Sequence, residues 1–180
     1  YAHSKGVIHR DLKPANIMVG RYNEVYVMDW GIARVMQRRD DMPEGWVELG
    51  APEGDDTLEE RTRAGQILGT PRYMSPQQAA GRNDELDGRS DLFSMGLILY
   101  ELLTLRPAFT ANNHIDLLKR VLKADKEPWS PYHPSRKIPT ELIAVVDKAT
   151  AQKAPNRYAG VAELAEEIRR YLRGVEVLAR

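Results

Sequence analysis

The most strongly apolar part of the chain lies at 92–103, where hydrophobic side chains occupy nearly every face of a helical projection. The polar residues before it supply a helix start near Gly88, with Ser90 or Asp91 able to cap the first turn. A helix that is apolar on all sides must be buried. The pattern therefore predicts a central helix that the rest of the fold surrounds.

Three further segments carry apolar residues at helical spacing. They run from His114 to Ala124, from Thr140 to about Ala151, and from Val161 to Leu172. Polar or proline-rich connectors at 107–113, 129–139 and 153–158 separate them, and Tyr1 to Lys5, closed by Gly6, has the composition of a last helical turn. The chain is thus predicted to be mainly α-helical.

One short region follows a different pattern. An apolar run at 17–19 is followed by turn residues at 20–23, and then Val25 and Val27 alternate with Tyr26 and Met28. This arrangement predicts a small β-hairpin. The predicted fold class is therefore mainly α with a small β-hairpin.

The composition fits one domain and narrows its chemistry. The chain has 180 residues, 42% of them hydrophobic, with 26 basic and 26 acidic side chains. Balanced charge gives no electrostatic reason to expect nucleic acid or an anionic membrane as partner. The absence of cysteine excludes a disulfide framework and a Cys-ligated metal site. No apolar run approaches the roughly 20 residues of a transmembrane helix, so no membrane segment is expected.

Chemically versatile residues gather in two motifs near the start of the chain. The first reads His-Arg-Asp-Leu-Lys-Pro-Ala-Asn from His9, and the second reads Asp-Trp-Gly from Asp29. A carboxylate such as Asp11 suits a hydroxyl proton, and Lys13 suits phosphate charge. The side-chain oxygens of Asn16 and Asp29 suit a hard ion such as Mg²⁺. The hairpin predicted between the motifs argues against a chance polar loop.

With these motifs the chain resembles a Hanks-type (bacterial-like) serine/threonine protein kinase, with Trp where the family usually has Phe. The resemblance implies that Asp11 is catalytic and accepts the substrate proton, and that Lys13 is catalytic and steadies the transferred phosphoryl group of ATP. It implies that Asn16 and Asp29 bind the cofactors, ATP and Mg²⁺, and are the metal ligands. Arg10 is expected to meet a phosphorylated activation loop.

In this family an activation segment would follow the second motif. Residues 35–68 mix charge, Gly and Pro without periodicity, which predicts a long insertion, either a solvated loop or a docking site. Between Ile32 and Leu68 only Thr57 and Thr62 carry a hydroxyl side chain. One of them is expected to be a regulatory phosphorylation site, with Thr62 favoured by its flanking arginines.

The strip from Gly69 to Gln77 resembles the substrate-facing strip of the same kinases. Thr70, together with Lys13, is the family's mark of Ser/Thr rather than Tyr specificity. Ser-Pro-Gln at 75–77 stands where the family usually has Ala-Pro-Glu. Gln77 is therefore expected to accept a hydrogen bond from Arg157, in place of a stronger charge-assisted one.

Two more residues are expected to support the site. The resemblance implies that Asp91 hydrogen-bonds the backbone of the first motif, with a simple helix N-cap as the alternative. His9 is expected to be a packed residue rather than a base, because Asp11 fills the base role in this family.

The resemblance implies a protein-kinase-like fold, of which this chain would form the C-terminal lobe only. The Gly-rich loop, the strand Lys and the helix Glu of an N-terminal lobe would all precede His9, so the chain is expected to be a fragment that is inactive alone. Residues 1–174 are predicted to form the lobe and 175–180 a tail.

The predicted function of the parent protein is transfer of the γ-phosphoryl group of Mg-ATP to Ser or Thr hydroxyls of proteins. The alternative is a pseudokinase or signalling scaffold that binds nucleotide or partners without turnover. The expected partners are protein substrates, with self-phosphorylation or a kinase dimer left open, and no nucleic acid. The resemblance implies a cytoplasmic kinase domain and leaves a membrane anchor of the parent open.

Overall fold

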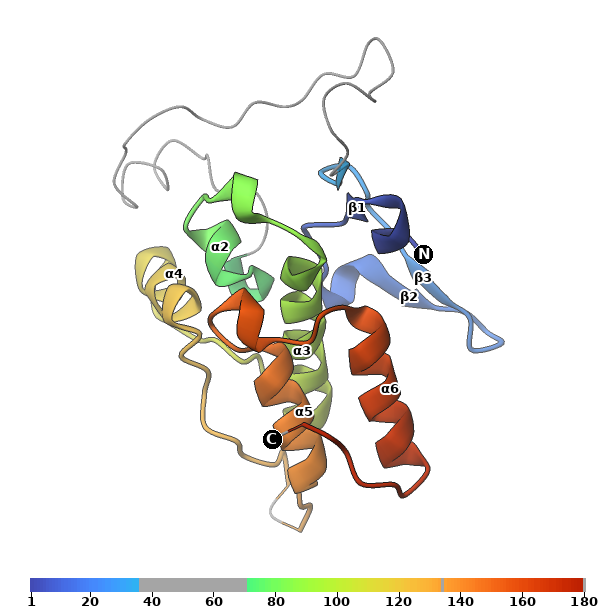
Figure 1. The fold of residues 1–180 in the computed structure, drawn as a ribbon. Coiled ribbons are helices and arrows are strands. Elements are labelled where there is room, and N and C mark those ends of the chain that lie inside the picture. The colour runs from blue at the N-terminus through green and yellow to red at the C-terminus, as the bar shows by residue number, and fades with distance from the viewer. Residues whose placement is uncertain (36–70, 134, 180) are drawn as a thin grey trace.

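The computed structural model describes residues 1–35, 71–133 and 135–179, which form a mainly helical body with two small sheets (Figure 1). The helices are α2 (Pro76–Ala79), α3 (Gly88–Thr104), α4 (His114–Lys123), α5 (Thr140–Ala149) and α6 (Val161–Leu172). Short 3-10 turns lie at His3–Lys5, Pro14–Asn16, Pro71–Tyr73, Asn83–Glu85 and Ala154–Asn156. The predicted fold class is confirmed, although α5 ends at Ala149 rather than Ala151.

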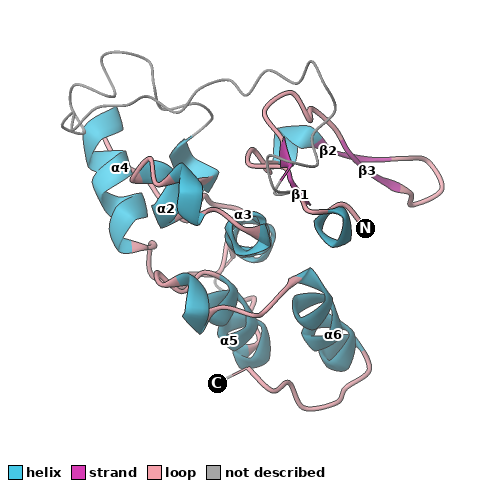
Figure 2. Cartoon of the chain, turned by 45° about the horizontal axis from the view of Figure 1, so that its top comes forward, coloured by secondary structure: helices cyan, strands magenta, loops and turns pink. Residues whose placement is uncertain are grey.

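Helix α3 is the centre of the body. In Figures 1 and 2, α2 and α4 lie on one side of it and α5 and α6 on the other, while the strands lie beside its N-terminal end. Helix α3 packs against α5 and α6, and α2 packs against α4. Most of its side chains are buried, including Leu92, Phe93 and Leu97. The prediction of a central, surrounded helix is correct.

Two hydrophobic clusters share α3 as their common wall. The larger cluster joins α3 to α2, α4 and the connector after α3, and its buried members are Met74, Ala79, Phe93, Leu97, Tyr100, Ala108, Phe109, Leu118, Val121 and Val146. The smaller cluster joins α3 to α5 and α6 through Leu92, Val145, Ala149, Tyr158, Leu164 and Ala179. Because α3 contributes to both clusters, it links the two groups of helices.

The start of α3 differs from the prediction. Its N-cap is Asp87, whose side chain accepts a hydrogen bond from the backbone N–H of Arg89 at 2.8 Å. The prediction that Ser90 or Asp91 caps the helix is wrong, because both residues lie inside the first turn and are buried. Asp91 is therefore available for another role.

The strands form two separate antiparallel pairs. Strand β2 (Ile17–Val19) pairs with β3 (Val25–Val27) in the register Ile17 to Val27, which confirms the predicted hairpin. Strand β1 (Val7–Ile8) pairs with β4 (Arg34–Val35), and this second pair was not predicted. Each of its strands has only two residues, too few to show an alternating pattern. Together the two pairs bring the start and the end of the first 35 residues side by side.

The segment after α6 packs on the body. Ala179 is buried in the smaller cluster, and Val177 packs against it. The buried carboxylate of Glu167 accepts hydrogen bonds from the backbone N–H groups of Leu178 and Ala179, at 2.7 and 2.8 Å. Residues 175–179, predicted as a tail, thus extend the body of the lobe.

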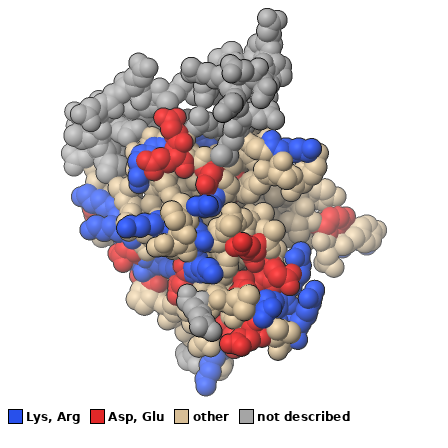
Figure 3. All heavy atoms as spheres, viewed as in Figure 1, with Lys and Arg blue, Asp and Glu red and all other residues tan. Residues whose placement is uncertain are grey.

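The surface carries both signs of charge. In Figure 3, Lys and Arg side chains are interspersed with Asp and Glu on the visible face. Within the described ranges, no helix is long and apolar enough to cross a membrane.

Candidate active site

The loop from His9 to Asn16, here called the HRD loop, begins directly after β1. His9 is buried, as predicted, and its Nε2 lies 2.8 Å from the carbonyl oxygen of Met28. Its Nδ1 lies 3.3 Å from the backbone N–H of Asp11. A carbonyl can only accept and an N–H can only donate, so the ring is the neutral tautomer with the proton on Nε2. The His9 ring thereby ties the HRD loop to the strand that leads to Asp29.

The Asp11 carboxylate is the meeting point of the loop's polar side chains. Its Oδ2 accepts hydrogen bonds from Nζ of Lys13 at 2.6 Å and from Nδ2 of Asn16 at 3.3 Å. The same Asn16 Nδ2 donates to the Asp11 backbone carbonyl at 2.9 Å. Among the described residues, no hydrogen bond to Oδ1 of Asp11 is found. One carboxylate oxygen is thus held by two donors, and the other by none of the described hydrogen bonds.

Asn16 and Asp29 lie at the same end of the β2–β3 hairpin. The backbone N–H of Met28 donates to the carbonyl oxygen of Asn16 at 2.9 Å, which places Asp29 next in the chain after this link. The Asp29 side chain is exposed and its φ is 61°, in the left-handed region. Because the Asn16 amide nitrogen faces Asp11, its oxygen could serve as a neutral ligand for a hard cation, beside the carboxylate of Asp29.

These two residues could contribute to a metal site without completing one. Within the part of the chain that the structure describes, no group of three or more His, Cys, Asp or Glu could hold a metal ion. Mg²⁺ is commonly bound by one or two protein oxygens together with substrate phosphates and water. The amide oxygen of Asn16 and the carboxylate of Asp29 fit that type of site.

Asp91, from the first turn of α3, binds the backbone of the HRD loop. Its Oδ2 accepts from the backbone N–H of His9 at 2.7 Å, and its Oδ1 accepts from the N–H of Arg10 at 2.8 Å. Asp91 also pairs with Nε2 of His3, at 2.7 Å. The expected contact of Asp91 with the loop backbone is therefore present, and the simple N-cap alternative is excluded. His3 was missed, because a lone His in a helical turn carries no sequence signal for a partner 88 positions away.

Arg10 has an unusual backbone conformation, with φ at 72°. Its carbonyl oxygen accepts from Nε2 of Gln78 at 2.6 Å, and its guanidinium donates to Oδ1 of Asn83 at 3.3 Å. The predicted partner of Arg10, a phosphorylated residue of the activation loop, is untested. Thr57, Thr62 and Thr70 lie outside the described residues, as does most of the predicted insertion at 35–68.

The predicted pair of Gln77 and Arg157 is present. Nη2 of Arg157 donates to Oε1 of Gln77 at 3.1 Å, and both side chains are buried. The guanidinium also donates to the backbone carbonyls of Ala151, Gln152 and Arg89. Burial lowers the pKa of Arg157 to about 10, since desolvation disfavours its charged form.

Trp30, which stands where the resemblance expects Phe, has a partner for its polar atom. Its Nε1 donates to the carbonyl oxygen of Val27 at 2.9 Å, and its ring lies edge-on to His9 with centroids 4.7 Å apart. The side chain is nevertheless 42% exposed. The tryptophan therefore covers the His9 ring on one side and presents its other side outward.

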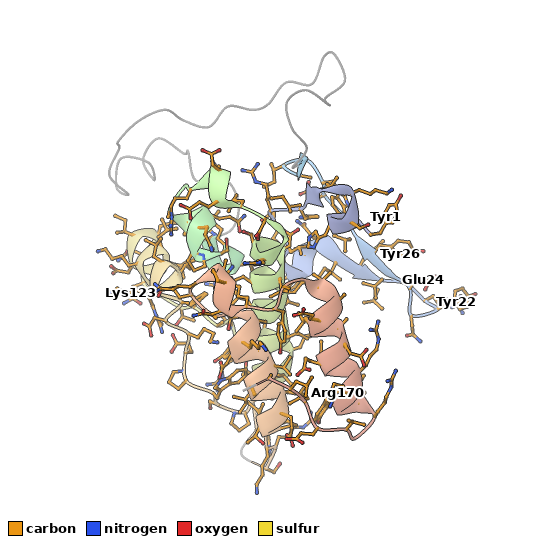
Figure 4. The ribbon with its side chains drawn as sticks, in the orientation of Figure 1. Tyr1, Tyr22, Glu24, Tyr26, Lys123 and Arg170 are labelled. Atoms are coloured by element: carbon orange, nitrogen blue, oxygen red, sulfur yellow. The ribbon has the colours of Figure 1, made fainter. Side chains whose placement is uncertain are left out.

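The hairpin exposes apolar side chains on both of its faces. In Figure 4, Tyr1, Tyr22 and Tyr26 all project from the strand side, away from the helical body. The exposed hydrophobic residues of the hairpin and its flanks are Met18, Val19, Tyr22, Val25, Tyr26, Val27 and Met28. Exposed apolar side chains in such numbers are typical of surfaces that contact another protein or a ligand.

The HRD loop thus brings a carboxylate, a lysine and an asparagine amide together, and a backbone hydrogen bond from Met28 to Asn16 links the loop to the segment that carries Asp29. The chain belongs to the protein kinase family, because the family model for the protein kinase domain matches residues 1–169.

Named relatives agree with that assignment. The chain is 37% identical over 174 residues to the serine/threonine-protein kinase PknD of Protochlamydia amoebophila. The aligned residues cover 97% of this chain and 17% of the relative. It is also 37% identical over 174 residues to the serine/threonine-protein kinase PknB of Mycobacterium tuberculosis, covering 97% of this chain and 24% of the relative. The chain thus spans a quarter or less of the length of these relatives.

Proposed function

We propose that the protein containing this chain is a serine/threonine protein kinase, which transfers the γ-phosphoryl group of Mg-ATP to Ser or Thr hydroxyls of protein substrates. The observation that carries the proposal is the convergence of Lys13 and Asn16 on one oxygen of the Asp11 carboxylate. The names of the relatives, serine/threonine-protein kinases, support it.

In the proposed reaction, Asp11 orients the substrate hydroxyl through Oδ1 and accepts its proton as the hydroxyl oxygen bonds to the γ-phosphorus. The bond between the γ-phosphorus and the bridging oxygen breaks, and ADP leaves. Lys13 holds the carboxylate by its ion pair and brings positive charge to the transferred group. Most of the rate enhancement in such reactions comes from positioning and charge neutralisation.

Asn16 and Asp29 would hold Mg²⁺ through their side-chain oxygens. When bound, the ion supplies neutralisation of phosphate charge and orients the phosphates. The contributions of this chain are the fixed amide of Asn16, held by Asp11, and the exposed carboxylate of Asp29.

The exposed apolar side chains of the hairpin and of Trp30 support a second part of the proposal, that an N-terminal lobe completes the nucleotide site in the parent protein. Among them, Tyr26 and Trp30 are 50% and 42% exposed. A lobe that covered them would bury apolar surface and close the site from the other side. The chain of 180 residues is accordingly proposed to be inactive alone.

A transfer assay tests the proposal. The full-length parent protein, the 180-residue chain and a full-length Asp11→Asn variant are incubated with radiolabelled ATP, Mg²⁺ and a general protein substrate. Label on Ser or Thr with the wild-type parent, and none with the 180-residue chain or with Asp11→Asn, is the expected result. A well-folded parent that transfers no label in any activation state would overturn the proposal in favour of a scaffold without turnover.

A further inference from the structure

Gln78 links helix α2 to the HRD loop, and the proposed reaction gives it no role. It lies in α2, directly after the segment at 71–75, and its side chain reaches the HRD loop. Its Oε1 accepts from the backbone N–H of Ser75 at 3.0 Å, while the Ser75 hydroxyl accepts from the Gln78 N–H at 3.3 Å. This reciprocal pair is a capping box. The Gln78 amide nitrogen is not needed for the box, and it donates to the carbonyl oxygen of Arg10 at 2.6 Å.

The Arg10 carbonyl is a significant place for such a contact. Arg10 has a φ of 72°, a conformation that a non-glycine residue keeps only when its surroundings hold it there. Its N–H is held by Asp91 on the α3 side, and its carbonyl is held by Gln78 on the α2 side. The loop backbone is thus clamped between two helices.

The same contact fixes the peptide that leads into Asp11. The carbonyl of Arg10 and the N–H of Asp11 belong to one planar unit, so their directions cannot change independently. Gln78 holds the carbonyl edge of this plane, and Nδ1 of His9 holds the N–H edge at 3.3 Å. A rotation of the plane would move the Asp11 side chain away from Lys13 and Asn16.

We propose that Gln78 is a positioning residue for Asp11, which acts by holding the Arg10–Asp11 peptide plane through its amide N–H. The inference rests on the proposed kinase function and adds a residue to it. Since α2 follows the strip at 71–75, a shift of that strip would reach the Asp11 carboxylate through this one side chain.

Gln78→Glu separates positioning from simple helix capping. Glutamate is as good as glutamine in a capping box and suits the N-terminal end of a helix, so α2 is kept. A carboxylate cannot donate to the Arg10 carbonyl, and its oxygens repel it. If Gln78 only caps α2, this variant keeps the kcat of the wild type.

The expected result in the full-length kinase is a loss of kcat of about tenfold or more, with an unchanged KM for ATP and a protein that is still folded at the assay temperature. Gln78→Met, which keeps the side-chain length without donor or charge, is expected to lose kcat likewise. Asn113→Ala is the matched control, because it removes the capping side chain of another helix, α4, and leaves Ser75 and Gln78 unchanged. It is expected to lower the melting temperature and keep kcat. Wild-type kcat in folded Gln78→Glu and Gln78→Met would overturn the inference.

A second readout does not depend on activity. Hydrogen exchange of the full-length protein, followed by mass spectrometry, reports opening of the HRD loop. Gln78→Glu is expected to speed exchange in peptides covering 9–13 while those of α3 stay protected, and unchanged exchange at 9–13 would contradict the inference. The proposed kinase function is tested separately, by label transfer in the wild type and its loss in Asp11→Asn.

Discussion

Arg157 and Gln77 are 80 positions apart in sequence and form a buried hydrogen bond of 3.1 Å between Nη2 and Oε1. The bond joins α2 to the turn before α6. The guanidinium lies over the Phe93 ring, 4.6 Å from its centroid, and its other donors reach backbone carbonyls. A buried cation thus has a neutral side chain where a carboxylate would give a charge-assisted bond.

Replacement of Gln77 by Glu is therefore expected to stabilise the protein, by about 1 kcal/mol. The new carboxylate would face a guanidinium that is already desolvated, and it would also raise the depressed pKa of Arg157. Thermal and urea unfolding measure the effect. Asn112→Asp, which adds the same charge at an exposed position, is the control and is expected to change little. An unchanged or lower midpoint for Gln77→Glu would count against the pairing.

Asp91→Asn tests the support of the HRD loop. The amide has one acceptor in place of two, so one backbone N–H, of His9 or of Arg10, would lose its buried partner. We expect a loss of about 2 kcal/mol in the free energy of unfolding and faster hydrogen exchange at 9–11. Asp125→Asn makes the same chemical change at a side chain that is 61% exposed, and is expected to cost far less. Equal effects of the two substitutions would remove the special role of Asp91.

The sequence predicted those parts of the fold that repeat with a period. Helices α3, α4, α5 and α6 and the β2–β3 hairpin show clear apolar spacing in the sequence. They appear within a few residues of their predicted limits. The β1–β4 pair could not be predicted, because two-residue strands have no period and their partners are distant in sequence. The cap of α3 was misplaced because Asp87, Ser90 and Asp91 are all good caps, and only tertiary burial decides among them.

The site divides in the same way. The residues of the HRD loop, the contact of Asp91 with the loop backbone and the contact of Gln77 with Arg157 follow from a resemblance to motifs, and these contacts are present. His3 and Gln78 could not be found by motif reading. His3 bonds a residue 88 positions away, and the Ser-x-x-Gln pattern at 75–78 implies a capping box but not the bond from the Gln78 amide nitrogen to Arg10.

Gly96 permits the close approach of α3 and α5. A Cβ atom at this position would lie 2.6 Å from Cγ2 of Thr150 and 3.0 Å from Cβ of Ala149. Gly96→Ala is therefore expected to destabilise the protein by about 1–3 kcal/mol, despite the higher helix propensity of alanine. Gly160→Ala is the matched control, because a Cβ there meets nothing within 4 Å, and its cost is expected to be about 0.5 kcal/mol or less. Chemical denaturation measures the free energy of unfolding of the two variants. A neutral Gly96→Ala would show that α5 can move away from α3.

Asp29→Asn separates the proposed metal ligand from the fold. Asparagine tolerates the left-handed conformation at this position, where φ is 61°, so the backbone is expected to be unchanged. The loss of one anionic ligand is expected to lower kcat of the full-length kinase by about 100-fold or more and to raise the Mg²⁺ concentration needed for activity. The melting temperature without Mg²⁺ should stay the same. A folded variant with full activity would exclude Asp29 as a metal ligand.

Glu127 gives the attachment of α4 a dependence on pH. Hydrogen bonds from Thr110 and then Arg120 lower the pKa of its carboxyl from the ordinary value of 4.5. Below that value the unfolded state binds more protons than the folded state, so the contribution of Glu127 to stability is present above pH 4.5 and is lost as the pH falls through the lowered pKa. Urea unfolding at a series of pH values is expected to show a shallower loss of stability at acid pH in Glu127→Gln than in the wild type. Glu176→Gln, at an exposed carboxylate, should leave the slope as it is, and equal slopes for all three proteins would show that the Glu127 contacts do not persist in solution.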